Sequence, residues 1–229
     1  MKNFNTAVMH VCVLGSNGFI GQNLLRGTDW LGVTRQYLDL TDQKAVDAFF
    51  DQSEPFDAVV HCAVVGGSRL KSDDGEVLYK NILMFENVVR HLGKIKRLVY
   101  FSSGAALRGD PPTDPYGLSK WMIDRRIETL GPNVYSLRIW GCYGPGELPT
   151  RFSAVCRATG HVVIQQDRYF DFIDVEDVKK IVEQYCSSGG EKYKNLVYPE
   201  KKKLSEWAEV FGATYTVLEP GLDTSYVST

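Results

Sequence analysis

Three glycines spaced three residues apart, in GSNGFIG at residues 15–21, constrain the fold of this chain more than any other feature. They follow the apolar run HVCVL and precede a predicted helix from residue 19 to about 26, so they lie where a strand passes into a helix. At such a junction, Gly15 is expected to make a tight turn, Gly18 to let the backbone approach a ligand, and Gly21 to let the helix pack on the strand. The pattern predicts a strand, a glycine turn and a helix.

The chain continues as an alternation of apolar runs and helical stretches. Strands are predicted at 9–14, 31–34, 56–63, 97–103 and 134–140, and helices at 19–26, 43–51, 75–91 and 116–130. Continuous apolar strands separated by helices are typical of βαβ units, in which helices cover both faces of a parallel sheet. The expected fold class is therefore α/β, with a doubly wound parallel sheet of the Rossmann type.

After Trp140 the pattern becomes less regular, because GCYGPGELP supplies glycines and prolines for a loop. Two further helices are predicted, at 174–185 and 204–212. The expected division is a core at 1–140 and a small C-terminal subdomain at 141–229, interleaved with the core.

Composition excludes several classes of protein. The 26 basic and 28 acidic residues give a net charge of −2, which argues against a nucleic-acid partner. The longest apolar runs, such as 58–65, are too short to cross a bilayer, and the first ten residues have no signal-peptide character, so a cytoplasmic protein without membrane contact is expected. The five cysteines are scattered and show no metal-ligand spacing, so no metal site is expected.

The glycine loop has the context of a dinucleotide-binding turn, because it begins directly after a strand and opens a helix of the first βαβ unit. Backbone N–H groups at the start of that helix are expected to hold the pyrophosphate. The predicted contacts are Gly15, Asn17, Gly18, Phe19, Ile20 and Gly21. The alternative is that the glycines serve packing alone.

The end of the second strand distinguishes the two nicotinamide cofactors, since an acid there binds the ribose of NAD and an arginine binds the 2′-phosphate of NADP. WLGVTR ends in Arg35, which favours NADP. If the strand instead extended to QYLDL, Asp39 would favour NAD. We place this stretch one element later, with Asp39 and Leu40 near the adenine.

Tyr116 and Lys120 lie four residues apart in PYGLSK, at the start of a predicted helix, and therefore share one face. An ammonium beside a phenol can lower the pKa of the phenol from near 10 and make it a better acid–base group at neutral pH. Lys120 could also donate to the ribose of a cofactor. A Tyr/Lys pair at this spacing is also common on ordinary surface helices.

An ordered set of motifs resembles the extended short-chain dehydrogenase/reductases, the family of nucleotide-sugar epimerases, dehydratases and reductases. The motifs are GSNGFIG, DLTD, HCAVVGG, Asn81 within YKNILMFENVV, FSSG, YGLSK, LRIWGCYGPG and FDFIDVEDV, covering about residues 9–185. HCAVVGGS and Thr34-Arg35 look most like the GDP-fucose synthase and 4-keto-sugar reductase branch.

This resemblance implies roles for individual residues. Tyr116 is the expected general acid or base, and Lys120 is expected to bind the nicotinamide ribose. Ala63, Val64 and Asn81 join the expected cofactor contacts.

Two positions depart from the family pattern. Gly104 stands where the family has a serine that bonds the substrate oxygen. Ser103 could reach that oxygen if the loop shifts by one residue, or a backbone N–H or a water could replace the hydroxyl. Phe170 stands where an arginine is common, although Arg151 and Arg168 lie in the same region. The chain is also short for the family, which implies a reduced substrate-binding subdomain.

The resemblance implies an NADP-dependent oxidoreductase or epimerase, with NAD as the other possible cofactor, acting on a nucleotide-linked 4-keto sugar. The alternative is a non-catalytic NAD(P)-binding sensor or scaffold of the same fold. The family also implies a homodimer formed through the helices at 75–91 and 116–130.

Overall fold

A computed structural model describes residues 9–68 and 70–228 of the chain. Its strands are β1 (Val11–Leu14), β2 (Leu31–Val33), β3 (Ala58–His61), β4 (Leu98–Ser103), β5 (Val134–Ile139), β6 (Gly141–Tyr143), β7 (His161–Asp167), β8 (Phe172–Asp174), β9 (Tyr193–Leu196) and β10 (Thr214–Leu222). Its helices are α1 (Phe19–Leu25), α2 (Gln43–Gln52), α3 (Gly75–Val89), α4 (Pro115–Glu128), α5 (Phe152–Thr159), α6 (Val175–Ser187) and α7 (Leu204–Val210), with 3-10 turns η1 (Leu92–Lys94) and η2 (Gly104–Leu107).

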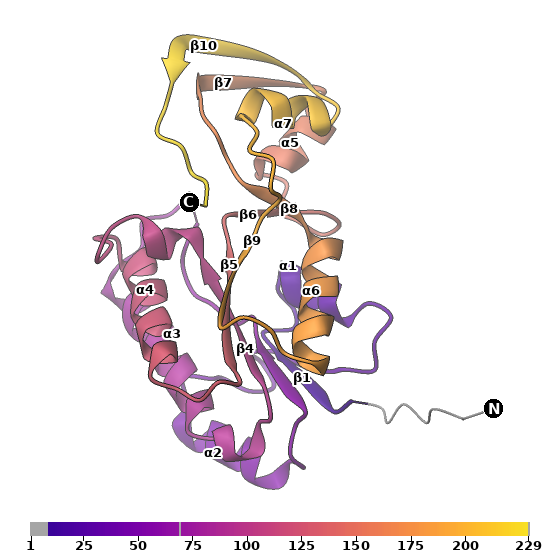
Figure 1. Cartoon of the computed structure of the whole chain (residues 1–229), viewed down its shortest axis with the longest axis vertical. Coiled ribbons are helices and arrows are strands. Elements are labelled where there is room, and N and C mark those ends of the chain that lie inside the picture. Colours follow the sequence, from indigo (N-terminus) through magenta and orange to yellow (C-terminus); the bar gives the residue numbers. More distant parts are fainter. Residues whose placement is uncertain (1–8, 69, 229) are drawn as a thin grey trace, which may run out of the picture.

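The central sheet has six parallel strands in the order β2-β1-β3-β4-β5-β9. Helices α2, α3 and α4 cover one face, and α1 and α6 cover the other (Figure 1). The predicted doubly wound α/β fold is confirmed. The predicted strands and helices all form, with ends that differ by a few residues, and β9 adds a strand that the sequence pattern did not indicate.

Aspartate side chains begin α2, α3, α4 and α6. In each case the carboxylate accepts a hydrogen bond from backbone N–H groups of the first turn, as at α4, where Asp114 Oδ1 lies 2.7 Å from the Gly117 nitrogen. Such caps satisfy donors that have no partner inside the helix, and each typically stabilises by about 1 kcal/mol. The caps therefore fix where the helices leave the sheet.

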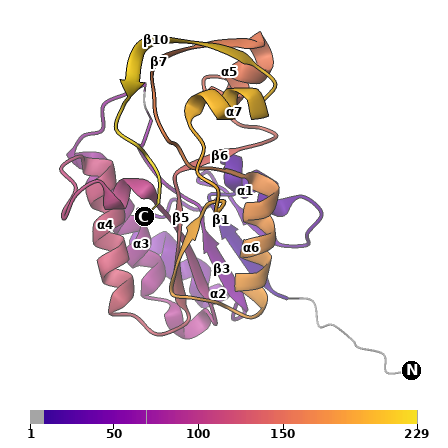
Figure 2. The same ribbon diagram turned by 45° about the horizontal axis from the view of Figure 1, so that its top comes forward.

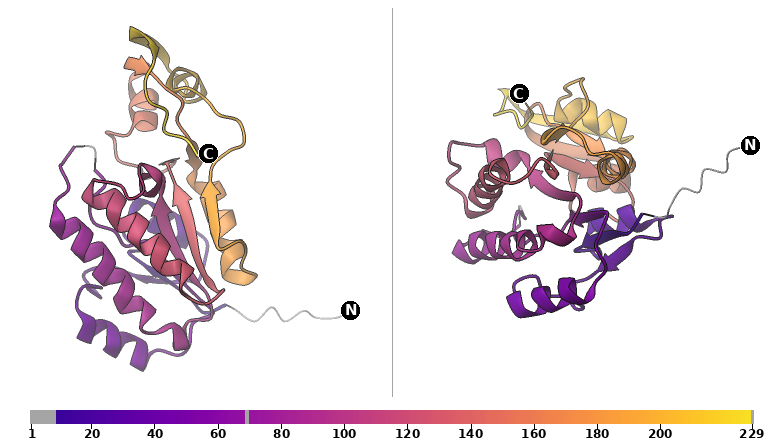
Figure 3. Two further views of the ribbon diagram at one scale, coloured as in Figure 1. Left: turned by 60° about the vertical axis from the view of Figure 1, so that its left-hand side comes forward. Right: turned by 60° about the horizontal axis from the view of Figure 1, so that its bottom comes forward.

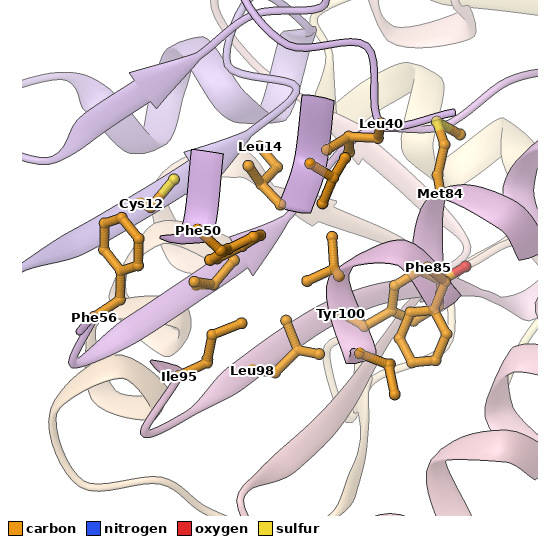
Figure 4. Close-up of a cluster of buried hydrophobic side chains, with 14 of the residues drawn as sticks. Cys12, Leu14, Leu40, Phe50, Phe56, Met84, Phe85, Ile95, Leu98 and Tyr100 are labelled. Carbon is orange, nitrogen blue, oxygen red and sulfur yellow. The ribbon is translucent and has the colours of Figure 1, made fainter. Parts of the chain in front are cut away.

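Side chains of the sheet and of α2 and α3 form the larger part of the core (Figure 4). Phe50, Phe85 and Leu98 are fully buried there, and Tyr100 is nearly so. Full burial of an apolar side chain of this size contributes about 1.5 to 3 kcal/mol. The core holds β3 and β4 rigidly, and both strands end at the site described below.

Residues beyond 140 contribute to two parts of the molecule. α6 packs beside α1, and β9 pairs with β5 in the main sheet. In contrast, β7 and β10 pair with one another and, with α5 and α7, form a small subdomain above the sheet around Phe172, Trp207 and Phe211 (Figures 1 and 2). None of the helices in the described ranges is both long enough and apolar enough to span a membrane.

The last described residues return from the small subdomain to the main sheet. After β10 the chain runs back toward the start of α4, so that the C-terminal end lies between the two parts of the molecule (Figures 1 and 3). Asp223 N–H donates to the Asp167 carbonyl, and Ser228 N–H donates to the buried Asp171 carboxylate, which also pairs with Lys201 at 2.7 Å. These bonds hold the segment in place.

Candidate active site

The sheet reverses its order of strands between β1 and β3, because the chain passes from β1 outward to β2 and then back to β3 on the other side of β1. In open α/β sheets, ligands bind in the crevice outside the carboxyl ends of the strands at such a switch point. The glycine loop follows β1 and the residues from Cys62 to Gly67 follow β3, so both loops flank this crevice. The topology therefore makes this switch point the candidate binding site.

The packing of the loop against its neighbours requires glycine at positions 15 and 21. Gly15 has a φ of +79°, and a Cβ there would lie 2.6 Å from the backbone nitrogen of Ala63. A Cβ at Gly21 would lie 2.6 Å from the Gly15 carbonyl oxygen. Both distances are far below van der Waals contact, so these glycines permit the close approach of β1, α1 and the loop after β3.

Gly18 is different, because nothing in the protein excludes a side chain there. Its φ of −76° is open to any residue, and a Cβ would meet only the Gly15 carbonyl oxygen, at 3.4 Å. Gly18 and Asn17 are exposed at the tip of the loop, with Phe19 and Ile20 partly buried behind them. A glycine that packing does not require is the feature expected where a backbone lies against a ligand.

Arg35 stands two residues beyond the end of β2, with its side chain 71% exposed and its guanidinium 3.5 Å from the Asp39 carboxylate. The strand does not extend to QYLDL, so Asp39 lies in the turn that follows, as our preferred assignment placed it. Asp39 accepts from the Thr41 hydroxyl and backbone N–H, and chiefly the hydroxyl lowers the pKa of its carboxyl group. Leu40 is 4% exposed and packs in the core, with its carbonyl held by Asn87.

Asn81 fixes the loop after β3 rather than facing the crevice. Its side-chain amide accepts from the Val65 N–H and donates to the Val65 carbonyl, both at 2.9 Å, and also donates to the Ser119 hydroxyl at 3.1 Å. These bonds leave Ala63 partly buried and Val64 exposed at the switch point. Asn81 is therefore a residue that positions the predicted cofactor contacts.

Tyr116 lies in the first turn of α4, where Pro115 and the Asp114 cap set the direction of the helix. Gly67 packs directly on its ring, since a Cβ at Gly67 would lie 2.8 Å from two ring carbons. The Ser103 hydroxyl at the end of β4 accepts from the Ala105 N–H and lies close enough to the phenol to lower its pKa. The structure thus brings together Tyr116 and Ser103 from separate elements at the carboxyl edge of the sheet.

Lys120 lies one turn further along α4 and is 3% exposed. Its ammonium donates to the Tyr100 hydroxyl at 2.8 Å and to the Phe101 carbonyl at 2.7 Å, and lies 5.7 Å from the centre of the Tyr116 ring. Burial lowers the pKa of Lys120 to about 7, although the nearby Asp124 carboxylate opposes this change. Lys120 therefore shares the predicted helix face with Tyr116.

The expected effect of Lys120 on Tyr116 is wrong for this structure. The sequence predicted a lowered phenol pKa, but burial raises the pKa of Tyr116 to about 12, and the nearby Ser103 hydroxyl only partly offsets this. The physical reason is that the ammonium of Lys120 is directed to Tyr100 and Phe101. At neutral pH the phenol keeps its proton.

The side of the crevice that faces the small subdomain contains residues that sequence reasoning missed. Tyr226 is held by a hydrogen bond to the Tyr169 carbonyl, packs on Phe170 with ring centres 5.2 Å apart, and carries the Arg108 guanidinium 5.0 Å from its own ring centre. Both Tyr226 and Arg108 lie close enough to Tyr116 to affect its pKa electrostatically. In the sequence, only its nearness to FSSG could have indicated Arg108 as a site residue, and no neighbouring motif indicates Tyr226.

Of the two arginines in the region of Phe170, only Arg151 affects the pKa of Tyr116. Arg151 precedes α5 and acts electrostatically on Tyr116. Arg168 pairs with Asp223 at 3.2 Å and lines a separate cavity of the small subdomain.

The family model described as "NAD dependent epimerase/dehydratase family" matches residues 11–196. A putative GDP-L-fucose synthase 2 from Oryza sativa subsp. japonica is 33% identical over 112 residues, which cover 44% of this chain and only 32% of that protein. An ADP-L-glycero-D-manno-heptose-6-epimerase from Pseudomonas paraeruginosa is 25% identical over 226 residues, covering 76% of this chain and 68% of the relative.

Two solved structures show the same fold. A dTDP-4-dehydrorhamnose reductase from Bacillus anthracis in complex with NADP has a TM-score of 0.78 at 18% identity, covering 93% of this chain and 86% of that one. The Bordetella bronchiseptica enzyme WbmG in complex with NAD has a TM-score of 0.77 at 22% identity, covering 98% and 85%.

Proposed function

Because the chain belongs to the NAD dependent epimerase/dehydratase family, we propose that it is an NADP(H)-dependent oxidoreductase of nucleotide-linked 4-keto sugars. The observation that carries this proposal is the meeting of Tyr116, Ser103 and Lys120 at the carboxyl edge of the sheet, beside the loops of the switch point. A surface Tyr/Lys pair would not be buried against Gly67 and Tyr100 in this way.

The residues at the switch point fit a dinucleotide. The exposed backbone around Gly18 would hold the pyrophosphate, and Arg35 would pair with the 2′-phosphate that distinguishes NADP from NAD. When bound, NADPH supplies the hydride that reduces the carbonyl carbon. The neighbouring structures that hold NADP or NAD support either nicotinamide cofactor on this fold, and the position of Arg35 favours NADP.

Lys120 can bind the nicotinamide ribose without leaving its present position. An ammonium has three N–H donors, and Tyr100 and Phe101 use two of them. The third remains for a ribose hydroxyl. Lys120 is thereby proposed as a positioning group for the cofactor.

Tyr116 would donate its proton to the carbonyl oxygen of the substrate as that oxygen gains negative charge. A phenol with a pKa of about 12 holds its proton at neutral pH, which suits an acid better than a base. Ser103 is the proposed second donor to the same oxygen.

The substrate would lie between the sheet and the small subdomain. Arg151, and Arg108 beside the Asp114 carboxylate at 3.8 Å, place guanidinium groups near Tyr116, which suits the diphosphate of a nucleotide sugar. The reductase from Bacillus anthracis and the heptose epimerase from Pseudomonas paraeruginosa act on substrates of this kind according to their names.

The test is NADPH oxidation, followed at the reduced-nicotinamide absorbance band, with a panel of nucleotide-4-keto-6-deoxysugars. We expect oxidation with at least one of them, and a loss of about 10²-fold or more in kcat for Tyr116→Phe, because general acid catalysis contributes about that much. Tyr215→Phe, on β10 away from the crevice, is the matched control. If no substrate is turned over while NADPH still binds, the protein is instead the non-catalytic sensor or scaffold.

The proposed assembly is a homodimer through α3 and α4, which lie side by side on one face of the sheet (Figure 1). Tyr79 and Met122 are 64% and 41% exposed on these helices, which leaves apolar area for a partner to cover. Light scattering of the wild type and of Met122→Glu would test this assembly.

A further inference from the structure

Trp140 occupies the space beside Gly104, at the position where the family resemblance places a serine. It follows the last residue of β5, and the register pairs that residue, Ile139, with Ser103 at the end of β4. If Gly104 carried a Cβ, the nearest atom would be the indole nitrogen of Trp140, at 2.4 Å. The indole therefore fills the volume that a serine side chain would need.

Trp140 is 8% exposed, and its indole N–H donates to none of the described residues without being one of their fully buried unpaired atoms, so the donor still reaches accessible space. Buried tryptophans usually satisfy this donor. The buried Trp207 follows that rule, since its indole N–H donates to the Phe170 carbonyl at 2.7 Å. An unpaired donor is therefore left at the carboxyl edge of the sheet, next to the strand end that carries Ser103.

We propose that the indole N–H of Trp140 donates a hydrogen bond to the carbonyl oxygen of the keto-sugar substrate, in place of the absent serine hydroxyl at Gly104. This inference rests on the proposed function, because it needs a carbonyl oxygen held beside Tyr116. Ser103 faces Tyr116 from the end of β4, and Trp140 approaches from the end of β5. The oxygen then receives bonds from Ser103 and Trp140 and the proton of Tyr116.

The arrangement also explains why residue 104 is a glycine. A serine at 104 would place its Cβ 2.4 to 2.5 Å from three atoms of the indole, so a serine and this tryptophan cannot occupy the site together. Either a serine at 104 or the indole of Trp140 can supply the hydrogen-bond donor, but both cannot be present together. The exclusion provides a rescue experiment, because a hydroxyl at 104 becomes sterically possible once the indole is removed.

The first test is kinetic, with the NADPH-oxidation assay. We expect Trp140→Phe, which keeps an apolar ring and lacks the N–H, to lose about 10²-fold in kcat, the effect of removing one donor to a developing oxyanion. The affinity for NADPH should not change. Trp140→Ala combined with Gly104→Ser should recover at least about tenfold over Trp140→Ala alone. Wild-type kcat in Trp140→Phe, or no recovery in the double variant, would overturn the inference.

The second test does not need turnover. The chain has four tryptophans, so 15N-labelled indoles give four signals, and the signal of Trp140 is identified by its loss in Trp140→Phe. With NADP⁺ present, adding the keto-sugar substrate should shift the Trp140 signal and leave those of Trp121 and Trp207 in place. A bound substrate that leaves the Trp140 signal unmoved would refute the inference while the proposed function stands. If NADP⁺ binds and no nucleotide sugar does, the proposed function fails and the inference fails with it.

Discussion

Gly18→Ala separates the binding role of the glycine loop from its packing role. Because Gly18 has a φ of −76° and a Cβ would approach only the Gly15 carbonyl oxygen, at 3.4 Å, alanine fits without strain. Alanine is worse than glycine at a helix N-cap by about 0.5 to 1 kcal/mol, but it reduces the freedom of the unfolded chain by a similar amount. The free energy of unfolding should therefore change by less than about 1 kcal/mol.

Gly15→Ala and Gly21→Ala are the matched controls, since each adds the same methyl group within the same loop. At Gly15 the left-handed backbone costs about 1 to 2 kcal/mol, and displacing the Ala63 backbone from 2.6 Å costs about 1 to 3 kcal/mol more. At Gly21 only the second cost applies. Both variants should be clearly less stable than Gly18→Ala in urea unfolding.

Among the folded variants, Gly18→Ala should lose the most affinity for NADPH, although its stability changes least. A methyl group at Gly18 stands where the backbone must approach the pyrophosphate, so calorimetric titration should show at least about a tenfold loss, or about 1.4 kcal/mol. Wild-type affinity in Gly18→Ala would refute the proposed cofactor site. A loss of stability in Gly18→Ala equal to that in Gly15→Ala would refute the account of the loop.

Three further predictions follow from the site. In the cofactor-free protein, Lys120 has a pKa of about 7 when folded and near 10.4 when unfolded, so the unfolded chain binds more protons between these pH values. The free energy of unfolding of the wild type, relative to that of Lys120→Met, should therefore rise from about pH 7 to 9 by at most about 1.4 kcal/mol per pH unit. A difference in urea unfolding that does not change with pH would contradict the low pKa. Arg35→Ala should weaken NADPH binding about tenfold or more in calorimetry and leave NADH binding nearly unchanged, whereas equal losses would mean that Arg35 does not read the 2′-phosphate. Tyr226→Ala should raise the KM for the sugar nucleotide severalfold without changing the Kd of NADPH, since the Tyr226 ring contacts Arg108 on the proposed substrate side. A weakened affinity for NADPH would show that Tyr226 acts on the cofactor site instead.

The parts of the fold that sequence could predict are those with local causes. The glycine loop, the apolar runs of the first five parallel strands and the capped helices each depend on residues close together in the chain, and the structure confirms them. Tyr116 and Lys120 share a face for the same reason, because a helix fixes the direction of residues four apart.

The remaining features depend on contacts between distant residues. β10 pairs with β7 although more than forty residues separate them, and most of its side chains are exposed, so its sequence lacks the apolar pattern of a buried strand. The raised pKa of Tyr116 depends on burial and on the direction of Lys120 toward Tyr100. Sequence identified Gly104 as a departure, but only the structure shows the indole that fills its place.

The proposed function requires this chain to pass a hydride between a nicotinamide and a sugar carbon beside Tyr116. Mass spectrometry of the sugar product formed with NADPH deuterated at the transferred position measures that passage directly. The account predicts that each product molecule made by the wild type carries a single deuterium, and that product from Tyr116→Phe forms at least about 10²-fold more slowly with the same label. Product without deuterium, or product formed equally fast by Tyr116→Phe, would contradict it.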